Sequence, residues 1–125
     1  MTENELSNII IGLAIKVHTA LGPGLLESSY EECLCYELRK EGLNVEKQKV
    51  LPLVYEELQL EVGYRIDIMV NKCVIIEVKA VQSLTDVHTA QVLTYLKLSK
   101  CKLGLLINFN VYRVKDGLKR VVNKL

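Results

Sequence analysis

The chain has 125 residues, of which 50% are hydrophobic and 25% are charged, and its formal net charge is +1. That length suits one domain over residues 1–125 with a real core, and the composition is ordinary for a soluble globular protein. The longest apolar stretch, residues 9–21, is too short to span a bilayer, and the acidic N-terminus argues against a secretory signal. We therefore expect no membrane segment.

The first half of the chain predicts two helices followed by short strands. Apolar residues at helical spacing predict helices over residues 3–21 and about 25–41. Gly22-Pro23-Gly24 ends the first helix, and Gly42 ends the second. Short strands are then expected at residues 44–50, 53–55 and 58–62.

The second half contains the stronger strand patterns. Strands are expected at residues 64–70 and 73–79, a helix at about 84–100, and an apolar central strand at 103–108. A last hairpin is predicted to turn at Asp116-Gly117. The resulting order, ααβββ(β)αββ, predicts an α/β or α+β fold with a mixed β-sheet.

Four cysteines, at positions 33, 35, 73 and 101, form no C-x-x-C pair. We expect them to be reduced and mostly buried thiols, as in a cytoplasmic protein.

Charge is distributed unevenly along the chain. Residues 1–94 carry 8 Lys/Arg against 14 Asp/Glu, or −6, whereas residues 95–125 carry 8 against 1, or +7. Such asymmetry can mark a surface that meets an anion such as nucleic acid. Alternatively, the basic C-terminal part pairs with the acidic helix that contains Glu31, Glu32, Glu37 and Glu41. The sequence leaves both interpretations open.

The strands at 64–70 and 73–79 alternate in polarity, with apolar residues at the even positions and polar ones among the odd positions. Arg65, Asp67, Glu77 and Lys79 are thus expected on one face and the core on the other. Antiparallel partners share a face, so the numbers of paired residues must have an even sum. A three-residue connection, 71–73, gives a sum of 144 and sets Asp67 opposite Glu77.

Two opposed carboxylates beside an ammonium group suit a hard cation and a bound water. Without a cation the two carboxylates repel each other, and burial adds several kcal/mol. The alternative is an exposed ladder of Arg-Asp and Glu-Lys ion pairs on a sheet face.

Helical residues supply further candidates. Gln91 and Tyr95 lie one turn apart on one face, and His88 lies near the same stripe. Glu27 falls in the first turn of the second helix, where an acid is also favoured by the helix dipole. His88 has an equally plain interpretation as a polar residue of a first turn.

The motifs together resemble the GxxExxY family of the PD-(D/E)XK nuclease superfamily. The resemblance rests on Gly24-x-x-Glu27-x-x-Tyr30, Gly63-Tyr64-Arg65-Ile66-Asp67 and residues 74–80, 88–97 and 104–109. Ile66 stands where the superfamily pattern has proline. The G-x-R-x-D, E-x-K and Q-x-x-x-Y set is also similar to RecB-like nucleases.

The resemblance implies a restriction-endonuclease-like core, a central mixed sheet flanked by helices. It implies Mg²⁺ or Mn²⁺ held by Asp67, Glu77, the Val78 carbonyl and Glu27, with Lys79 acting on the attacking water. Gln91 and Tyr95 would complete the catalytic group, and the candidates for substrate positioning are Arg65, His88 and Tyr30.

The function expected on this basis is metal-dependent hydrolysis of phosphodiester bonds in DNA or RNA. The alternative is a non-catalytic binding or assembly module that keeps the fold and an anion- or metal-binding pocket. A homodimer is also expected, through apolar residues of the first helix such as Ile9, Ile11 and Ile15.

Overall fold

A computed structural model describes residues 1–61 and 63–125 of the chain. Its three α-helices are α1 (Glu3–Leu21), α2 (Glu27–Lys40) and α3 (Asp86–Ser99). The strands are β1 (Val45–Val50), β2 (Leu53–Tyr55), β3 (Leu58–Leu60), β4 (Arg65–Val70), β5 (Val74–Lys79), β6 (Leu103–Asn108) and β7 (Leu118–Val122). The predicted segments follow one another as expected, but five strands separate α2 and α3 where the order ααβββ(β)αββ has at most four. Position 62, the end of the predicted strand 58–62, lies outside the described residues.

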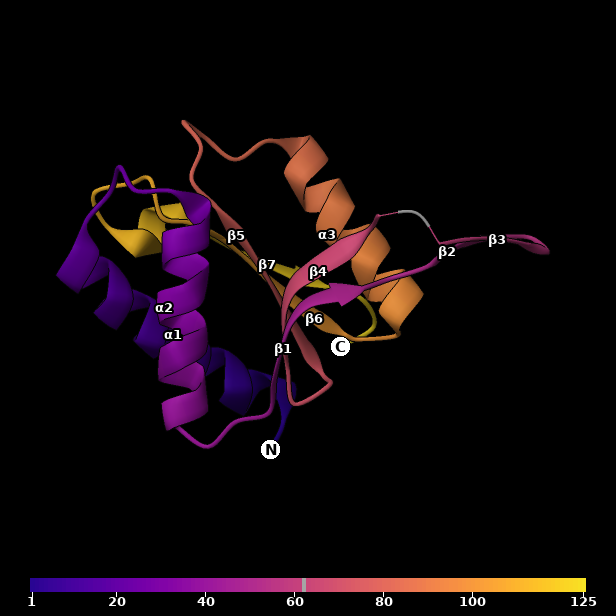
Figure 1. Cartoon of the computed structure of the whole chain (residues 1–125), viewed down its shortest axis with the longest axis horizontal. Coiled ribbons are helices and arrows are strands. Elements are labelled where there is room, and N and C mark those ends of the chain that lie inside the picture. The colour runs from indigo at the N-terminus through magenta and orange to yellow at the C-terminus, as the bar shows by residue number, and fades with distance from the viewer. Residues whose placement is uncertain (62) are drawn as a thin grey trace.

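Five of the strands form a mixed sheet in the order β1-β4-β5-β6-β7. Only β5 and β6 run parallel within this sheet, because α3 connects them as a crossover, and the other neighbours are antiparallel. Helices α1 and α2 lie on one side of the sheet and α3 on the other (Figure 1). The predicted mixed sheet flanked by helices is therefore confirmed.

Each side of the sheet has its own hydrophobic core. Helices α1 and α2 pack on β-strand residues that include Ile68, Ile76 and Leu105. Helix α3 packs through Val92 and Leu96 on the opposite face. Burial on both faces explains the nearly continuous apolar runs of β5 and β6.

The connection between β4 and β5 has the predicted register. Ile68 pairs with Ile76 and Val70 with Val74, so the partner numbers sum to 144. The three-residue turn carries positive φ angles at Asn71 and Lys72, of 51° and 56°. The predicted even sum is therefore confirmed for residues 68–70 and 74–76, and the main-chain pairing stops short of Asp67 and Glu77.

The predicted division into one core face and one polar face is wrong. Met69 and Ile75, both odd-numbered, are buried in the core under α3. Moreover, Ile66 packs in that same core, whereas Ile68 packs against α1 and α2. Because residues two apart in a strand should share a face, the alternation must break at Asp67. The polar residues are therefore confined to one end of the strand pair.

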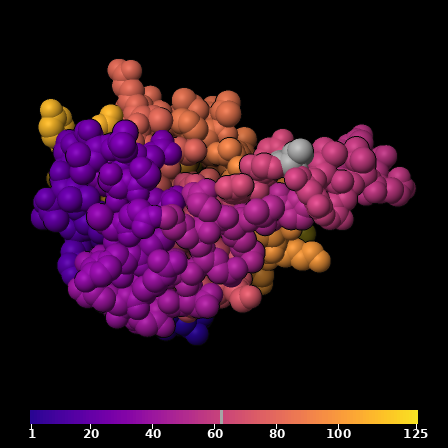
Figure 2. All heavy atoms as spheres, in the orientation of Figure 1, coloured from indigo at the N-terminus to yellow at the C-terminus, as the bar shows by residue number. Residues whose placement is uncertain are grey.

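Beyond the central sheet, β2 and β3 form a separate two-stranded hairpin. It projects from the body of the molecule (Figures 1 and 2). Val54, Tyr55 and Leu58 on this hairpin are exposed.

The predicted hairpin turn at Asp116-Gly117 is wrong. Residues Val114–Gly117 form a 3₁₀ helix, η1, and β7 begins directly after it and pairs with β6. A Cβ at Gly117 would lie 2.3 Å from the Asn108 carbonyl oxygen, so this close approach requires glycine. In the part of the chain that the structure describes, no helix has the length and hydrophobicity that a membrane crossing requires.

Candidate active site

Asp67 and Glu77 meet where the ladder between β4 and β5 ends. The Asp67 N–H donates to Glu77 Oε2 at 2.8 Å, and the Val78 N–H donates to Asp67 Oδ2 at 2.9 Å. Main-chain pairing of β4 and β5 extends to Ile68 and Ile76, and beyond that point these two side-chain hydrogen bonds join the strands. They hold the two acidic side chains between the two strands.

Glu77 is only 3% exposed. Burial, followed by repulsion from Asp67, raises the pKa of Glu77 to about 8, against the smaller opposing effects of the Asp67 N–H and Lys79. Burial also raises the pKa of Asp67, while the Val78 N–H, Gln48 and Lys79 act to lower it. The positive charge near the two carboxyls is therefore too small to offset the free-energy cost of ionising both of them.

Lys79 lies two residues beyond Glu77 and is half-buried. Its charge favours ionisation of both carboxyls, as expected for an ammonium group beside them. The Lys79 carbonyl accepts a hydrogen bond of 2.9 Å from the Phe109 N–H, which fixes the end of β5 against the segment after β6.

Helix α2 brings Glu27 to the same edge of the sheet. Glu27 Oε2 accepts a 3.2 Å hydrogen bond from the Ala80 N–H, directly after Lys79. Glu27 is the first residue of α2, and the α1–α2 loop sets where that helix begins.

Tyr30 is buried, and its observed contacts lie within the protein, so its role in substrate positioning stays a prediction. Its ring stacks on Phe109 with a centroid distance of 4.6 Å, and its hydroxyl donates to the Gly22 carbonyl at 2.6 Å. The same hydroxyl accepts the Leu25 N–H at 3.1 Å. Tyr30 therefore fixes the loop that presents Glu27.

Helix α3 contributes Tyr95 and Gln91 from the other side of the sheet. Burial raises the pKa of the Tyr95 hydroxyl, as do the charges of Glu77 and Asp67, and hydrogen bonding to Gln91 opposes the rise. Both residues line a hollow of about 220 Å³ together with Tyr64. Because the charges of Glu77 and Asp67 raise the pKa of Tyr95, this face of α3 lies within electrostatic range of the two carboxyls.

These positions agree with a comparison against known families. A family model described as the PD-(D/E)XK nuclease superfamily matches residues 4–121. The chain belongs to the PD-(D/E)XK nuclease superfamily. Searches of curated proteins and of solved structures gave no match.

The pattern in the name of the PD-(D/E)XK superfamily corresponds here to Ile66-Asp67 and Glu77-Val78-Lys79. The structure brings Asp67 into contact with Glu77 through one hydrogen bond and with the Val78 N–H through another. It adds Glu27 through Ala80. The predicted convergence of these residues with Gln91 into one concave pocket stays a prediction.

Two other predicted positions have plainer roles. His88 Nδ1 accepts the Thr85 N–H at 3.1 Å, and the pair forms the capping box of α3. His88 thus caps α3, and its role in substrate positioning stays a prediction. Arg65 is exposed at the start of β4, in register with Val50, and its positioning role likewise stays a prediction.

Sequence reasoning missed Gln48 and Glu31. The Gln48 amide donates to Glu31 Oε1 at 2.8 Å and to Asp67 Oδ1 at 3.3 Å. Gln48 has a φ of +53° within β1, a left-handed conformation that costs free energy in a residue other than glycine. Glu31 was detectable, since it follows Glu27 by one turn on the same face of α2. No sequence signal marked Gln48.

Asn108, at the end of β6, was also missed. Its side chain donates to the Val81 carbonyl at 2.9 Å and accepts the Val81 N–H at 3.1 Å. Asn108 is 1% exposed and clamps the segment that leaves the site after Lys79. A polar residue that ends an apolar strand was the available signal.

The oxygen donors of the site fit a small hard cation. In residues 1–61 and 63–125, no three His, Cys, Asp or Glu side chains are grouped as metal ligands. Mg²⁺, however, commonly uses one or two carboxylates and keeps several waters. Asp67 and Glu77 meet that requirement, and burial with mutual repulsion gives them reason to bind a cation.

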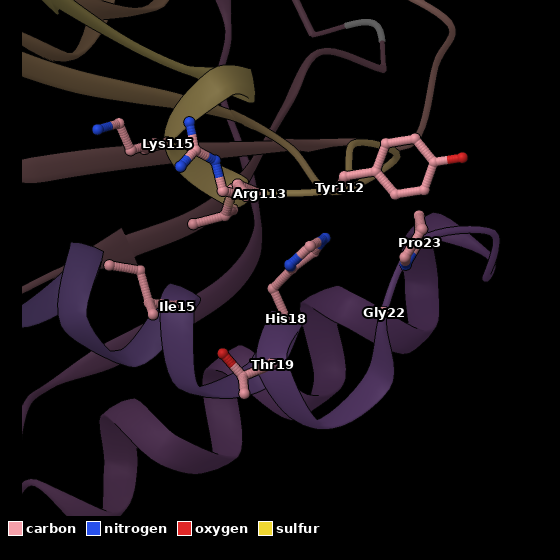
Figure 3. A pocket seen from close by; sticks show the side chains of 9 residues that line it. Ile15, His18, Thr19, Gly22, Pro23, Tyr112, Arg113 and Lys115 are labelled. Atoms are coloured by element: carbon pink, nitrogen blue, oxygen red, sulfur yellow. The ribbon is translucent and has the colours of Figure 1, made fainter.

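A larger hollow, of about 460 Å³, lies elsewhere, between the end of α1 and the segment after β6 (Figure 3). His18, Tyr112, Arg113 and Lys115 are among its lining residues. His18 Nε2 contacts the Val111 carbonyl at 2.7 Å and so ties this segment to α1. None of the predicted site residues lines this hollow.

Proposed function

We propose that this chain is a Mg²⁺- or Mn²⁺-dependent nuclease that hydrolyses phosphodiester bonds of DNA or RNA. The observation that carries the proposal is the pair of hydrogen bonds beside Lys79 in which Glu77 accepts the Asp67 N–H and Asp67 accepts the Val78 N–H. A sheet that needed only stability has no use for two repelling carboxylates in its interior.

Asp67, Glu77 and the Val78 carbonyl would hold the cation, with Glu27 adjoining them. The Val78 N–H faces Asp67, and in a strand the carbonyl of the same residue faces the same neighbour. When bound, the cation supplies a polarised water and stabilises negative charge on phosphate oxygens.

The Lys79 ammonium would donate a hydrogen bond to the attacking water or to a non-bridging phosphate oxygen. Tyr95 stays protonated because its pKa is raised by burial and by Glu77, so its hydroxyl remains available as a donor. Gln91, one helical turn before Tyr95 on α3, would orient that hydroxyl.

The proposal is tested by separating metal binding from cleavage. Lys79→Ala should retain Mg²⁺ binding by calorimetry but cleave a DNA and RNA panel at least about 10²-fold more slowly. Asp67→Asn should lose both, and Lys40→Ala, on the last turn of α2, should lose neither. If Lys79→Ala cleaves at the wild-type rate, or wild type cleaves nothing while binding metal, the non-catalytic module is the correct function.

The proposal extends to assembly and compartment. Ile15 on α1 is 46% exposed and can join a homodimer interface. Ile11 packs against the core, so it adds less apolar surface to that interface than expected. Light scattering at micromolar concentration should show a dimer, and a monomer would refute it.

All four cysteines are free thiols, which supports a reducing compartment such as the cytoplasm.

A further inference from the structure

A second hollow, of about 410 Å³, is surrounded by lysines. We call it the lysine hollow, and its lining residues are Lys97, Lys100, Cys101, Lys102, Asn123 and Lys124. It lies at the end of α3, before β6 and after β7. Because Leu103 pairs with Val74 and Asn108 with Lys79, this hollow lies at the opposite end of the sheet from the candidate active site.

The four lysines of the hollow are exposed and lack acidic partners. Within the described ranges, none of the four has a carboxylate oxygen within 4.0 Å. The acids of α2 pair instead with N-terminal lysines: Glu37 with Lys16 and Lys40, and Glu32 with Lys47.

These ion pairs decide between the two interpretations of the charge asymmetry. The basic C-terminal part of the chain does not neutralise the acidic helix, because that helix has its own basic partners. The positive charge of the lysine hollow is therefore left to an external anion.

We propose that the lysine hollow binds the phosphate backbone of a nucleic acid strand, as an anchor remote from the cleavage site. This proposal rests on the proposed nuclease function for the identity of its partner. Lysine ammonium groups act as mobile point charges that match successive phosphates without reading bases. The lining residues include no aromatic side chain on which a base would stack, so binding at the hollow is independent of sequence.

Helix α3 links this anchor to the candidate active site. Gln91 lines the hollow of about 220 Å³ beside Tyr95, not the lysine hollow, and it precedes Lys97 on the same helix. The rise from Gln91 to Lys97 is about 9 Å along the helix axis. That length corresponds to about three nucleotide steps of a duplex strand. A strand held at the lysine hollow can thus extend along α3 as far as Gln91.

The experiment compares two double variants with the same change in charge. Lys97→Glu/Lys102→Glu removes two lysines of the hollow at positions with ordinary φ angles. The control, Lys16→Glu/Lys40→Glu, removes one lysine from α1 and one from α2. Lys40 lies in the last turn of α2, as Lys97 lies in the last turn of α3. Fluorescence anisotropy measures binding of a labelled 20-base-pair duplex in EDTA, so that no cleavage occurs, at several salt concentrations.

We expect the hollow variant to bind at least tenfold more weakly at 0.1 M salt. Its slope of log affinity against log salt should fall by about 1.8, since each lost phosphate contact contributes about 0.9. The control variant should keep the wild-type slope. Equal losses in both variants, or no binding by wild type, would overturn the proposal.

Two further arms keep the result interpretable. Lys97→Gln/Lys102→Gln, with an unchanged melting temperature, should reproduce the loss, and a wild-type slope in this variant would overturn the proposal. A polyglutamate of equal charge should not displace the duplex; displacement would assign the hollow to an acidic protein instead. If neither wild type nor any variant cleaves nucleic acid with Mg²⁺, but the hollow variant still has the smaller salt slope, the nuclease function fails while the anchor stands.

Discussion

Replacing Glu77 by glutamine should stabilise the metal-free protein at alkaline pH. Glutamine keeps the shape of the side chain and an oxygen that accepts the Asp67 N–H. It removes the charge that burial and Asp67 oppose. Removal of one member of a repelling buried pair relieves both the desolvation and the repulsion.

The size and sign of the effect follow from the pKa of Glu77. This pKa rises from about 4.5 to about 8 on folding. Between those values the folded state holds a proton that the unfolded state has released, so the free energy of unfolding falls as pH rises. Full titration across that interval corresponds to at most about 5 kcal/mol. The raised pKa values of Asp67 and Glu31 act in the same direction.

Urea unfolding in EDTA at pH 5, 6, 7 and 8 measures this effect. Wild type should lose stability steadily from pH 5 to pH 8, and Glu77→Gln should show a much flatter profile with a higher midpoint at pH 8. Glu37→Gln is the control, because Glu37 is paired with Lys16 and Lys40 on the surface. A wild-type profile that is flat, or parallel to that of Glu77→Gln, would refute the account of a strained carboxylate pair.

Three further outcomes are expected. Mg²⁺ at ~100 times its Kd should add about 2.7 kcal/mol to the free energy of unfolding of wild type and much less to that of Asp67→Asn. Equal thermal shifts in the two proteins would count against the site. Gln48→Gly should weaken Mg²⁺ binding about tenfold in calorimetry, since it frees Asp67, with little loss of stability because glycine accepts a φ of +53°. Gly104→Ala should cost about 1–3 kcal/mol in urea unfolding, because its Cβ would lie 2.5 Å from Val92 Cγ1, and an unchanged midpoint contradicts this.

The register of β4 and β5 was predictable because parity is a strict rule. A shared face for Asp67 and Glu77 requires an even sum of partner numbers, and the three-residue turn supplies that sum for residues 68–70 and 74–76. The burial of Met69 and Ile75 was predictable in principle from their apolar character, since α3 needs a face to cover. The break in alternation at Asp67 was not predictable, since it coincides with a contact to Gln48, whose left-handed conformation no local pattern marks.

The site residues show the same division. Asp67, Glu77 and Lys79 are recognisable from spacing along two adjacent strands. The roles of Tyr30 and Asn108 depend on contacts with residues distant in sequence, Phe109 and Val81 respectively. Such long-range contacts leave no periodic signal in a single sequence.

The energetics of the strand pair separate what the fold needs from what it only tolerates. Met69 and Ile75, in the same two strands, show that this region accepts apolar side chains in a packed core. Buried ionised groups can often be replaced by apolar residues without loss of stability, so Asp67 and Glu77 are not there to hold the sheet together. Together with the left-handed Gln48, they form a local region whose cost is offset by the two hydrophobic cores on either side. A gain in stability on neutralising Glu77, joined to a loss of metal binding, is the pair of results that this balance requires.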